Sequence, residues 1–248
     1  EQIIGTWMRE RGNRADIVLA TKVGKSPESA GLSSRAIRLS VEASLSRLQS
    51  DHIDLLYFHA EDPATPLTES LAAVGDLIDQ GKVRALGASN FSTATLLQAR
   101  ILASDGLPRF EAVTLEQSLL RRDIVDAETL LALEGQRLGF MPYFVLANGF
   151  LGRYRDLKPM NYEDARRRRA SSFNNRHGQH ALRALDDVAM SHGVDVSTVA
   201  VAWSLAQPAV TSVVVGADSV SDLEALMFGA QVKLTGGQLS ELDRASAR

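Results

Sequence analysis

The chain alternates short apolar runs with longer segments in which apolar residues recur every three or four positions. Six short runs are rich in β-branched and aliphatic residues and predict strands at 16–21, 53–58, 83–87, 112–115, 140–146 and 211–215. The periodic segments predict helices that begin near 33, 67, 93, 126, 181, 197 and 219. A long polar stretch follows the fifth strand, and a polar tail follows the last predicted helix.

Strands that alternate with helices pair in parallel, and continuous apolar strands are buried on both faces, so the predicted fold class is α/β. The segment Val23–Pro27, after the first strand, lacks the glycine-rich fingerprint of an open doubly wound sheet. A parallel (β/α)8 TIM barrel is therefore favoured, as a single domain over residues 1–248. Such a barrel has eight strands, so we expect two N-terminal strands to be lacking and the runs at 16–21 and 211–215 to form edges.

Polar residues stand at the ends of several predicted strands, which is where parallel α/β barrels carry their chemistry. Lys22 ends the first strand and is either a partly desolvated ammonium that supports proton transfer or an ordinary surface lysine. His59 ends the second strand and is either an active-site imidazole or a hydrogen-bonded histidine of the core. Tyr143 could stack on a planar ring or simply fill the mouth of the barrel.

Two further pairs of residues follow predicted strands. Ser89 and Asn90 could orient an amide such as a nicotinamide carboxamide, or could cap the next helix. Gly216–Ala217 lies between a strand and a helix, where backbone amides can receive a phosphate, although a tight turn without a ligand would look the same. Asp218 lies in that turn and Asp222 just after it, and both would repel an additional phosphate on a ribose.

Composition narrows the classes of function. The 248 residues carry a net charge of −3, which predicts no general affinity for nucleic acid, and no apolar run reaches the roughly 20 residues that a membrane span needs. The chain has no cysteine, so disulfides and thiolate chemistry are excluded. We expect a cytoplasmic protein because the sequence shows neither a membrane span nor a signal-like start at Glu1–Gly5. The run Arg166–Arg169 predicts a solvated surface, whereas His177 and His180 are expected on a mobile loop without a metal site.

Several segments together resemble the aldo-keto reductase family. They are Ile17–Gly24, Ser44–Leu48 leading into Asp51–Leu55, Gly81–Arg84 running to Gly87–Phe91, Phe150–Leu151, Trp203 and the Gly216–Ala217 turn. The resemblance extends from Glu1 almost to the C-terminus and implies an NADPH-linked reduction of an aldehyde or ketone on a (β/α)8 barrel. Family members use a tyrosine as proton donor, helped by a lysine, a histidine and an aspartate. Lys22 and His59 match two of these four, and the other two are expected upstream of Glu1.

The resemblance also implies which residues hold the cofactor. The implied contacts are Ser89, Asn90, Thr114, Tyr143, Leu146, Gly216 and Ala217. Thr114 stands where the family usually has a glutamine, and Gln117 stands where it usually has a tyrosine. Asp218 and Asp222 replace residues that suit NADPH, so NADP(H) is implied by the family while NAD(H) stays open.

Three functions therefore remain in view, of which the third is a structural partner that pairs with another chain through the exposed edges of the predicted sheet. The first is an oxidoreductase acting on a small-molecule carbonyl, without membrane or nucleic-acid partners, and compatible with a homo-oligomer. The alternative is a non-catalytic relative in which the same pocket binds a ligand or serves a regulatory subunit, because several cofactor contacts depart from the family pattern.

Overall fold

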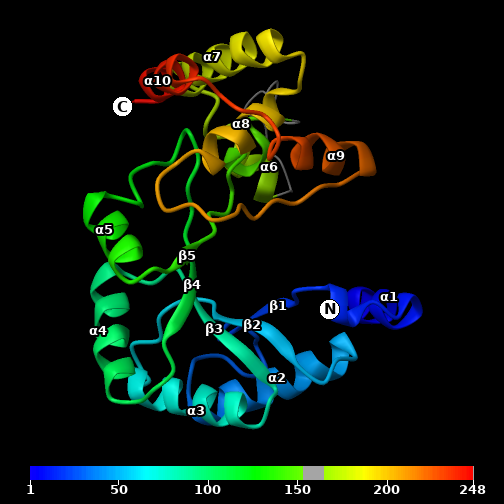
Figure 1. The fold of residues 1–248 in the computed structure, drawn as a ribbon, viewed down its shortest axis with the longest axis vertical. Helices are drawn as coiled ribbons and strands as arrows, with labels where there is room; N and C mark the ends of the chain where they lie inside the picture. The colour runs from blue at the N-terminus through cyan, green and yellow to red at the C-terminus, as the bar shows by residue number, and fades with distance from the viewer. Residues whose placement is uncertain (153–164, 248) are drawn as a thin grey trace. The chain divides into compact units, whose positions relative to one another are not determined.

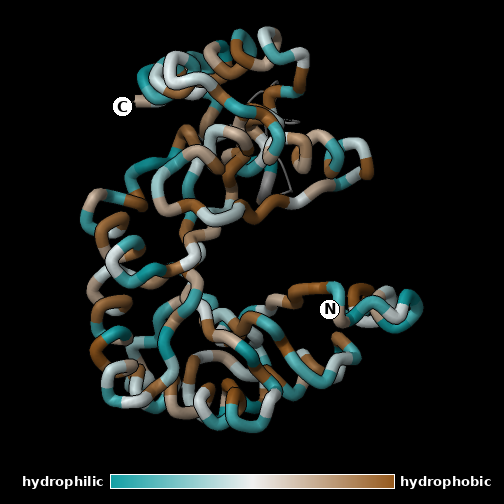
Figure 2. Tube along the Cα trace, in the orientation of Figure 1, coloured by the Kyte–Doolittle hydropathy of each residue, from teal (hydrophilic) through white to brown (hydrophobic). Residues whose placement is uncertain are grey.

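A computed structural model describes residues 1–152 and 165–247 (Figure 1). The chain divides into two compact units. The first unit contains Glu1–Thr114 and Leu131–Leu138, and the second contains Leu115–Leu130 and Gly139–Arg248. In both units hydrophobic and hydrophilic colours alternate along the helices (Figure 2), as expected for helices that bury one apolar face.

The first unit is built around four parallel strands. They are β1 (Ala20–Val23), β2 (Ile53–Phe58), β3 (Val83–Ser89) and β4 (Phe110–Thr114), and each pairs with the next in this order. The helices are α1 (Gln2–Arg11), the 3₁₀ turn η1 (Arg14–Asp16), α2 (Ser34–Leu48), α3 (Leu67–Asp79) and α4 (Thr93–Ser104). Each of the last three connects consecutive strands, so the predicted parallel α/β organisation is confirmed here.

Helix α2 illustrates why the sequence folds in this way. Ser33 caps it by accepting a hydrogen bond from the Ala36 amide, as its position before the periodic segment predicts. Ile37, Val41 and Leu48 are almost completely buried, and they recur at helical spacing. The apolar face of this helix therefore packs inward, while its polar face meets solvent.

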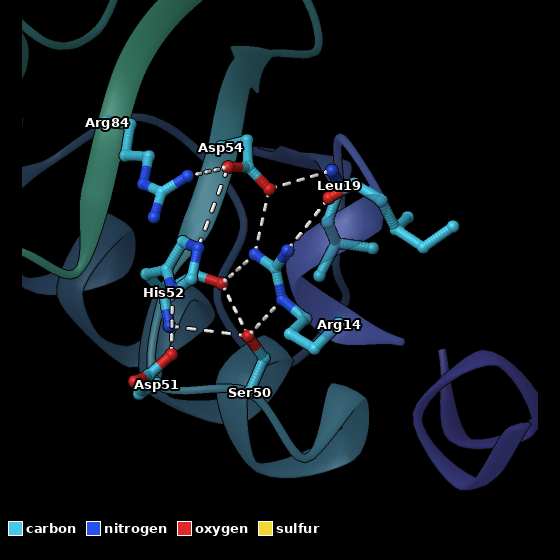
Figure 3. A network of polar contacts seen from close by, with 8 residues as sticks. Arg14, Leu19, Ser50, Asp51, His52, Asp54 and Arg84 are labelled. Carbon is cyan, nitrogen blue, oxygen red and sulfur yellow. Dashed lines mark hydrogen bonds and ion pairs between the residues drawn. The ribbon is translucent and has the colours of Figure 1, made fainter. Parts of the chain in front are cut away.

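One carboxylate joins the starts of the first three strands (Figure 3). Asp54 on β2 accepts hydrogen bonds from Arg14 Nη2 at 2.8 Å, from Arg84 Nη1 on β3 at 2.6 Å and from the Leu19 amide before β1 at 2.9 Å. Burial opposes ionisation of this carboxyl, but the Leu19 amide and the two guanidinium groups outweigh it and lower the pKa of Asp54. The network thus fixes the register at the end of the sheet opposite the carboxyl ends of the strands.

The second unit is mainly helical. Its elements are β5 (Gly139–Phe140), η2 (Ala147–Gly149), α6 (Ala165–Ser171), α7 (Arg176–His192), α8 (Val196–Leu205), α9 (Val220–Phe228) and α10 (Gly236–Ala245), and α5 (Ala127–Gly135) begins in this unit and ends in the first. Trp203 on α8 is fully buried and donates from Nε1 to Asp243 Oδ1 on α10 at 3.0 Å. This bond satisfies the indole N–H within the core of the unit.

The strand predictions need three corrections, so five strands replace the predicted six in the described residues. The first strand begins later, at Ala20, because residues 14–16 form a 3₁₀ turn. The strand predicted at 140–146 is wrong beyond Phe140, since Phe144 has φ of 56° and the backbone turns. The segment 211–215 forms one isolated bridge instead of a strand, from Val214 to Tyr143, and Val210 just before it bridges to Phe140.

Two predictions about polar segments are also wrong. The tail contains α10, which begins with a capping box of Thr235 and Gln238 and buries Leu242. The expected mobile loop around His177 and His180 is the first turn of α7, where His180 Nδ1 lies 3.1 Å from the carbonyl oxygen of Ala245. In both segments the few apolar residues that a helix buries stand among many polar residues. The segments therefore looked like loops, which explains both errors.

Three further expectations concerned the arginine run, now in α6, the absence of a membrane span and the absence of a metal site. Arg167, Arg168 and Arg169 are exposed on α6, which confirms the solvated surface for these three, while the side chain of Arg166 lies outside the described residues. In the part of the chain that the structure describes, no helix has the length and apolar character to cross a membrane. The same residues contain no group of three or more metal-ligating His, Asp or Glu side chains.

Candidate functional site

The first unit gathers the predicted polar residues at one edge of its sheet. Lys22 pairs with Tyr57 across β1 and β2, and Ser89 pairs with Thr114 across β3 and β4. The amide of His59, directly after β2, donates to the Val23 carbonyl at 3.0 Å. Because these strands are parallel, their carboxyl ends meet at the same edge, which therefore carries Lys22, His59, Ser89 and Thr114.

Lys22 lies against an aromatic ring. Its Nζ is 5.6 Å from the centroid of the Tyr57 ring, and desolvation by the surrounding protein lowers the pKa of the Lys22 ammonium although the side chain keeps contact with solvent. Burial raises the pKa of Tyr57 to about 12, so this ring stays neutral beneath the cation. Gly87 leaves space for the ring, since a Cβ there would lie 2.5 Å from Tyr57 Cε1.

His59 shares a pocket with Lys22. The pocket measures about 490 Å³, and Lys25, Glu28 and Arg47 also line it. Burial lowers the pKa of His59, and the positive charges of Lys25 and Lys22 lower it further. The imidazole is therefore neutral near pH 7 and can donate a hydrogen bond from one nitrogen while accepting at the other.

Ser89 and Asn90 are held as a pair. Asn90 Nδ2 donates to Ser89 Oγ at 3.0 Å and to the His59 carbonyl at 3.2 Å, while the Asn90 amide donates to the Thr114 carbonyl at 3.1 Å. Asn90 has φ of 57°, the left-handed region that asparagine tolerates better than most residues. Ser92 caps α4, so the alternative that Ser89 or Asn90 caps this helix is wrong.

Thr114 and Gln117 each have a buried side-chain oxygen that finds no hydrogen-bond partner among the described residues. The side chain of Thr114 is in the first unit and 1% exposed, and its Oγ1 makes no hydrogen bond within the described residues. Gln117, in the second unit, is 6% exposed and its Oε1 is equally unpaired there. Unsatisfied buried polar atoms are uncommon, and each of these two is a candidate contact for a polar ligand.

Tyr143 is held by backbone bonds within the second unit. Its amide donates to the Leu115 carbonyl at 3.0 Å, and its carbonyl accepts from the Gln117 amide at 3.2 Å. The half-buried ring lies 4.9 Å from the ring of Phe144, at an interplanar angle of 71°. The backbone is thus fixed while part of the ring stays accessible to a planar ligand.

A pocket of about 860 Å³ lies within the second unit. Its lining includes Leu146, Gly149, Asp186, Asp195, Ser197, Gly216, Asp218, Ser221 and Asp222. Helices α8 and α9 both begin at this pocket, with Asp195 and Ser219 as their N-caps. Leu146 and Gly216 were expected here, and Ala217 is exposed beside Gly216, whereas the contributions of Asp186 and Asp195 were not foreseen.

Part of the lining of this pocket is open backbone beside a glycine and the first turns of two helices. Beside Gly216 the space is open, because a Cβ at that position would meet no atom within 4 Å. The first turns of α8 and α9 have amides that a helix does not bond internally, and such groups bind phosphate. Gly216, Ser197 and Ser221 line this part of the pocket, and Ala217 follows Gly216 on the exposed turn.

The first unit is thus a parallel α/β unit with polar groups at the carboxyl ends of its strands, the edge at which parallel α/β proteins carry their chemistry. The sequence model of the aldo/keto reductase family matches residues 1–247. The chain therefore belongs to the aldo-keto reductase family, whose members are (β/α)8 barrels and generally use NAD(P)H.

Named relatives support this assignment. Norsolorinic acid reductase B of Aspergillus parasiticus is 31% identical over 259 residues, which cover 99% of this chain and 67% of that protein. The uncharacterized oxidoreductase YrpG of Bacillus subtilis is 34% identical over 246 residues, or 94% of this chain and 73% of that protein. A probable voltage-gated potassium channel subunit beta of Arabidopsis thaliana is 31% identical over 243 residues, or 94% of this chain and 74% of that protein.

Proposed function

We propose that this protein is an NAD(P)H-dependent reductase of small-molecule aldehydes or ketones. The observation that carries the proposal is the shared pocket of Lys22 and His59, two residues that match the family's catalytic set. Their strand-end positions and the lowered pKa of each side chain suit groups that act on a carbonyl oxygen. The cytoplasm is the compartment we propose, on the composition of the sequence.

The two side chains have different roles in this proposal. The neutral imidazole of His59 donates a hydrogen bond to the substrate oxygen and orients it. The ammonium of Lys22 stabilises the negative charge that develops on that oxygen, and the proton that completes the hydroxyl group is drawn from solvent water. The bound cofactor supplies the hydride that adds to the carbonyl carbon. Tyr57 positions Lys22 by lying under its ammonium.

Two sets of residues are proposed to hold the cofactor. Ser89, Asn90 and Thr114 of the first unit bind the nicotinamide carboxamide, since they offer hydroxyl and amide groups at one sheet edge. Tyr143 of the second unit stacks on a planar ring. Leu146, Gly216 and Ala217, at or beside the pocket of that unit, bind the remainder of the dinucleotide.

A second candidate function is a ligand-binding or regulatory subunit without turnover. The similarity to a potassium channel subunit beta favours it, as does the replacement of the usual glutamine and tyrosine by Thr114 and Gln117. In this case the protein would bind the cofactor without reducing an aldehyde or ketone.

The test separates these two functions with one substitution. Lys22→Met should leave the dissociation constant for the reduced cofactor unchanged while it lowers carbonyl turnover by about 10²–10⁴-fold. Lys233→Met is the matched control, because Lys233 is exposed and lies in neither pocket. Cofactor binding without turnover in the full-length wild-type protein, across a panel of aldehydes and ketones, would establish the regulatory candidate instead.

A further inference from the structure

The residue after Tyr143 has a backbone conformation that its side chain does not favour. Phe144 has φ of 56°, the left-handed region in which the Cβ of an L residue crowds the backbone. Glycine adopts this conformation without that cost, whereas a bulky side chain is rare there. Residues held in such conformations cluster at functional sites, which makes Phe144 a candidate for a functional residue.

The chain that follows Phe144 fixes this conformation. The Ala147 amide donates to the Phe144 carbonyl at 2.7 Å. Val145 is 2% exposed and belongs to a buried cluster with Val201 and Leu226. The backbone path through residue 144 is thus held by a hydrogen bond and by packing that do not involve the Phe144 ring.

The ring of Phe144 lies beside the ring of Tyr143. The two centroids are 4.9 Å apart and the interplanar angle is 71°, an edge-to-face geometry that is favourable between aromatic rings. Within the described residues this is the one aromatic contact that Phe144 makes, and Phe144 is 38% exposed. The ring therefore contacts Tyr143 while it contributes little to the core of the second unit.

We infer that Phe144 is a positioning residue, whose ring holds Tyr143 in the orientation in which Tyr143 stacks on the planar ring of the cofactor. The inference rests on the proposed function, since the stacking of Tyr143 is part of it. A ring that is already oriented loses less side-chain freedom when the cofactor binds, so the cofactor binds more tightly.

The first experiment compares Phe144→Leu with the wild type. The full-length protein is titrated with NADH and with NADPH, followed by cofactor fluorescence and by the circular dichroism of the bound reduced nicotinamide. Leucine keeps an apolar side chain but removes the ring. We expect the dissociation constant to rise about 2- to 10-fold, the change to which the loss of one aromatic pair corresponds, and the dichroism of the bound cofactor to weaken. Phe144→Tyr keeps a ring and should bind the cofactor as the wild type does.

A double-mutant cycle tests whether Phe144 acts through Tyr143. In a Tyr143→Leu background, Phe144→Leu should cause no further loss of cofactor affinity, because the ring that Phe144 positions is absent. Phe144→Gly relieves the backbone but also lacks the ring, so it should bind the cofactor no more tightly than Phe144→Leu. Phe228→Leu is the matched control, since Phe228 is 46% exposed in the same unit, and it should leave the affinity unchanged.

The outcomes separate this inference from the proposed function. Unchanged affinity in Phe144→Leu, wild-type affinity in Phe144→Gly or weak binding by Phe144→Tyr would each overturn the inference and leave the proposed reductase intact. The same holds if Phe144→Leu loses as much affinity in the Tyr143→Leu background as in the wild type, or if Phe228→Leu is weakened equally. Urea denaturation of each variant verifies that it is folded. Absence of binding by both cofactors in the folded wild-type protein would overturn the proposed function together with the inference.

Discussion

Gly87→Ala should disrupt the support beneath Lys22. The new Cβ would lie 2.5 Å from Tyr57 Cε1 and 2.6 Å from Cδ1, whereas carbon atoms in favourable contact are about 3.5–4.0 Å apart. The Tyr57 ring must therefore move by roughly 1 Å in a site where it is only 5% exposed. Overpacking of this kind costs about 1–3 kcal/mol of unfolding free energy.

The assay is urea denaturation of Gly87→Ala beside a matched variant, Gly135→Ala. A Cβ at Gly135 would meet no atom within 4 Å, and this residue is in helix α5, so the same change should stabilise by up to about 1 kcal/mol. In a Tyr57→Ala background the cost of Gly87→Ala should largely vanish, because the clashing ring is absent. A cost that persists in that background would refute the proposed clash.

Three further predictions concern charge and packing. Asp54→Asn should lower the free energy of unfolding by about 2–4 kcal/mol at pH 7, and the deficit should shrink as the pH falls below about 4, because a carboxyl with a lowered pKa stabilises the fold only while it is ionised. Titration by NMR should give His59 a pKa below its ordinary value, and Lys25→Met should raise that pKa by removing a nearby positive charge; an unchanged pKa would exclude the Lys25 contribution. Trp203→Phe should cost about 1–3 kcal/mol, since it leaves Asp243 without its indole donor, and urea denaturation that shows no loss would contradict this role.

Much of the first unit follows from the sequence because local signals and burial agree there. The segments that became α2, β2, α3 and β3 combine a regular apolar period with clear caps or turns. In the second unit the same reasoning fails at 140–146, whose apolar composition fits a strand. Its backbone adopts positive φ at Phe144 and Ala147, which no single-residue propensity indicates.

The candidate site likewise contains residues that the sequence alone indicates and residues that only the folded structure brings together. Lys22 and His59 could be identified because a polar residue at the end of an apolar strand is a local pattern. Tyr57 could not, since inside an apolar run it looks like any core aromatic, and only the fold places Lys22 above it. Asp186 and Asp195 could not be assigned to a site either, because they join Asp218 only when distant helices pack around one pocket.

Transfer of deuterium from NADH or NADPH labelled at the reactive C4 position to an aldehyde, catalysed by the full-length protein, tests the central claim most directly. The account predicts that the alcohol product carries the label on the former carbonyl carbon, and that Lys22→Met makes its formation about 10²–10⁴-fold slower while the reduced cofactor still binds. A reduced cofactor that binds but delivers no label to any carbonyl in the panel would contradict the assignment as a reductase.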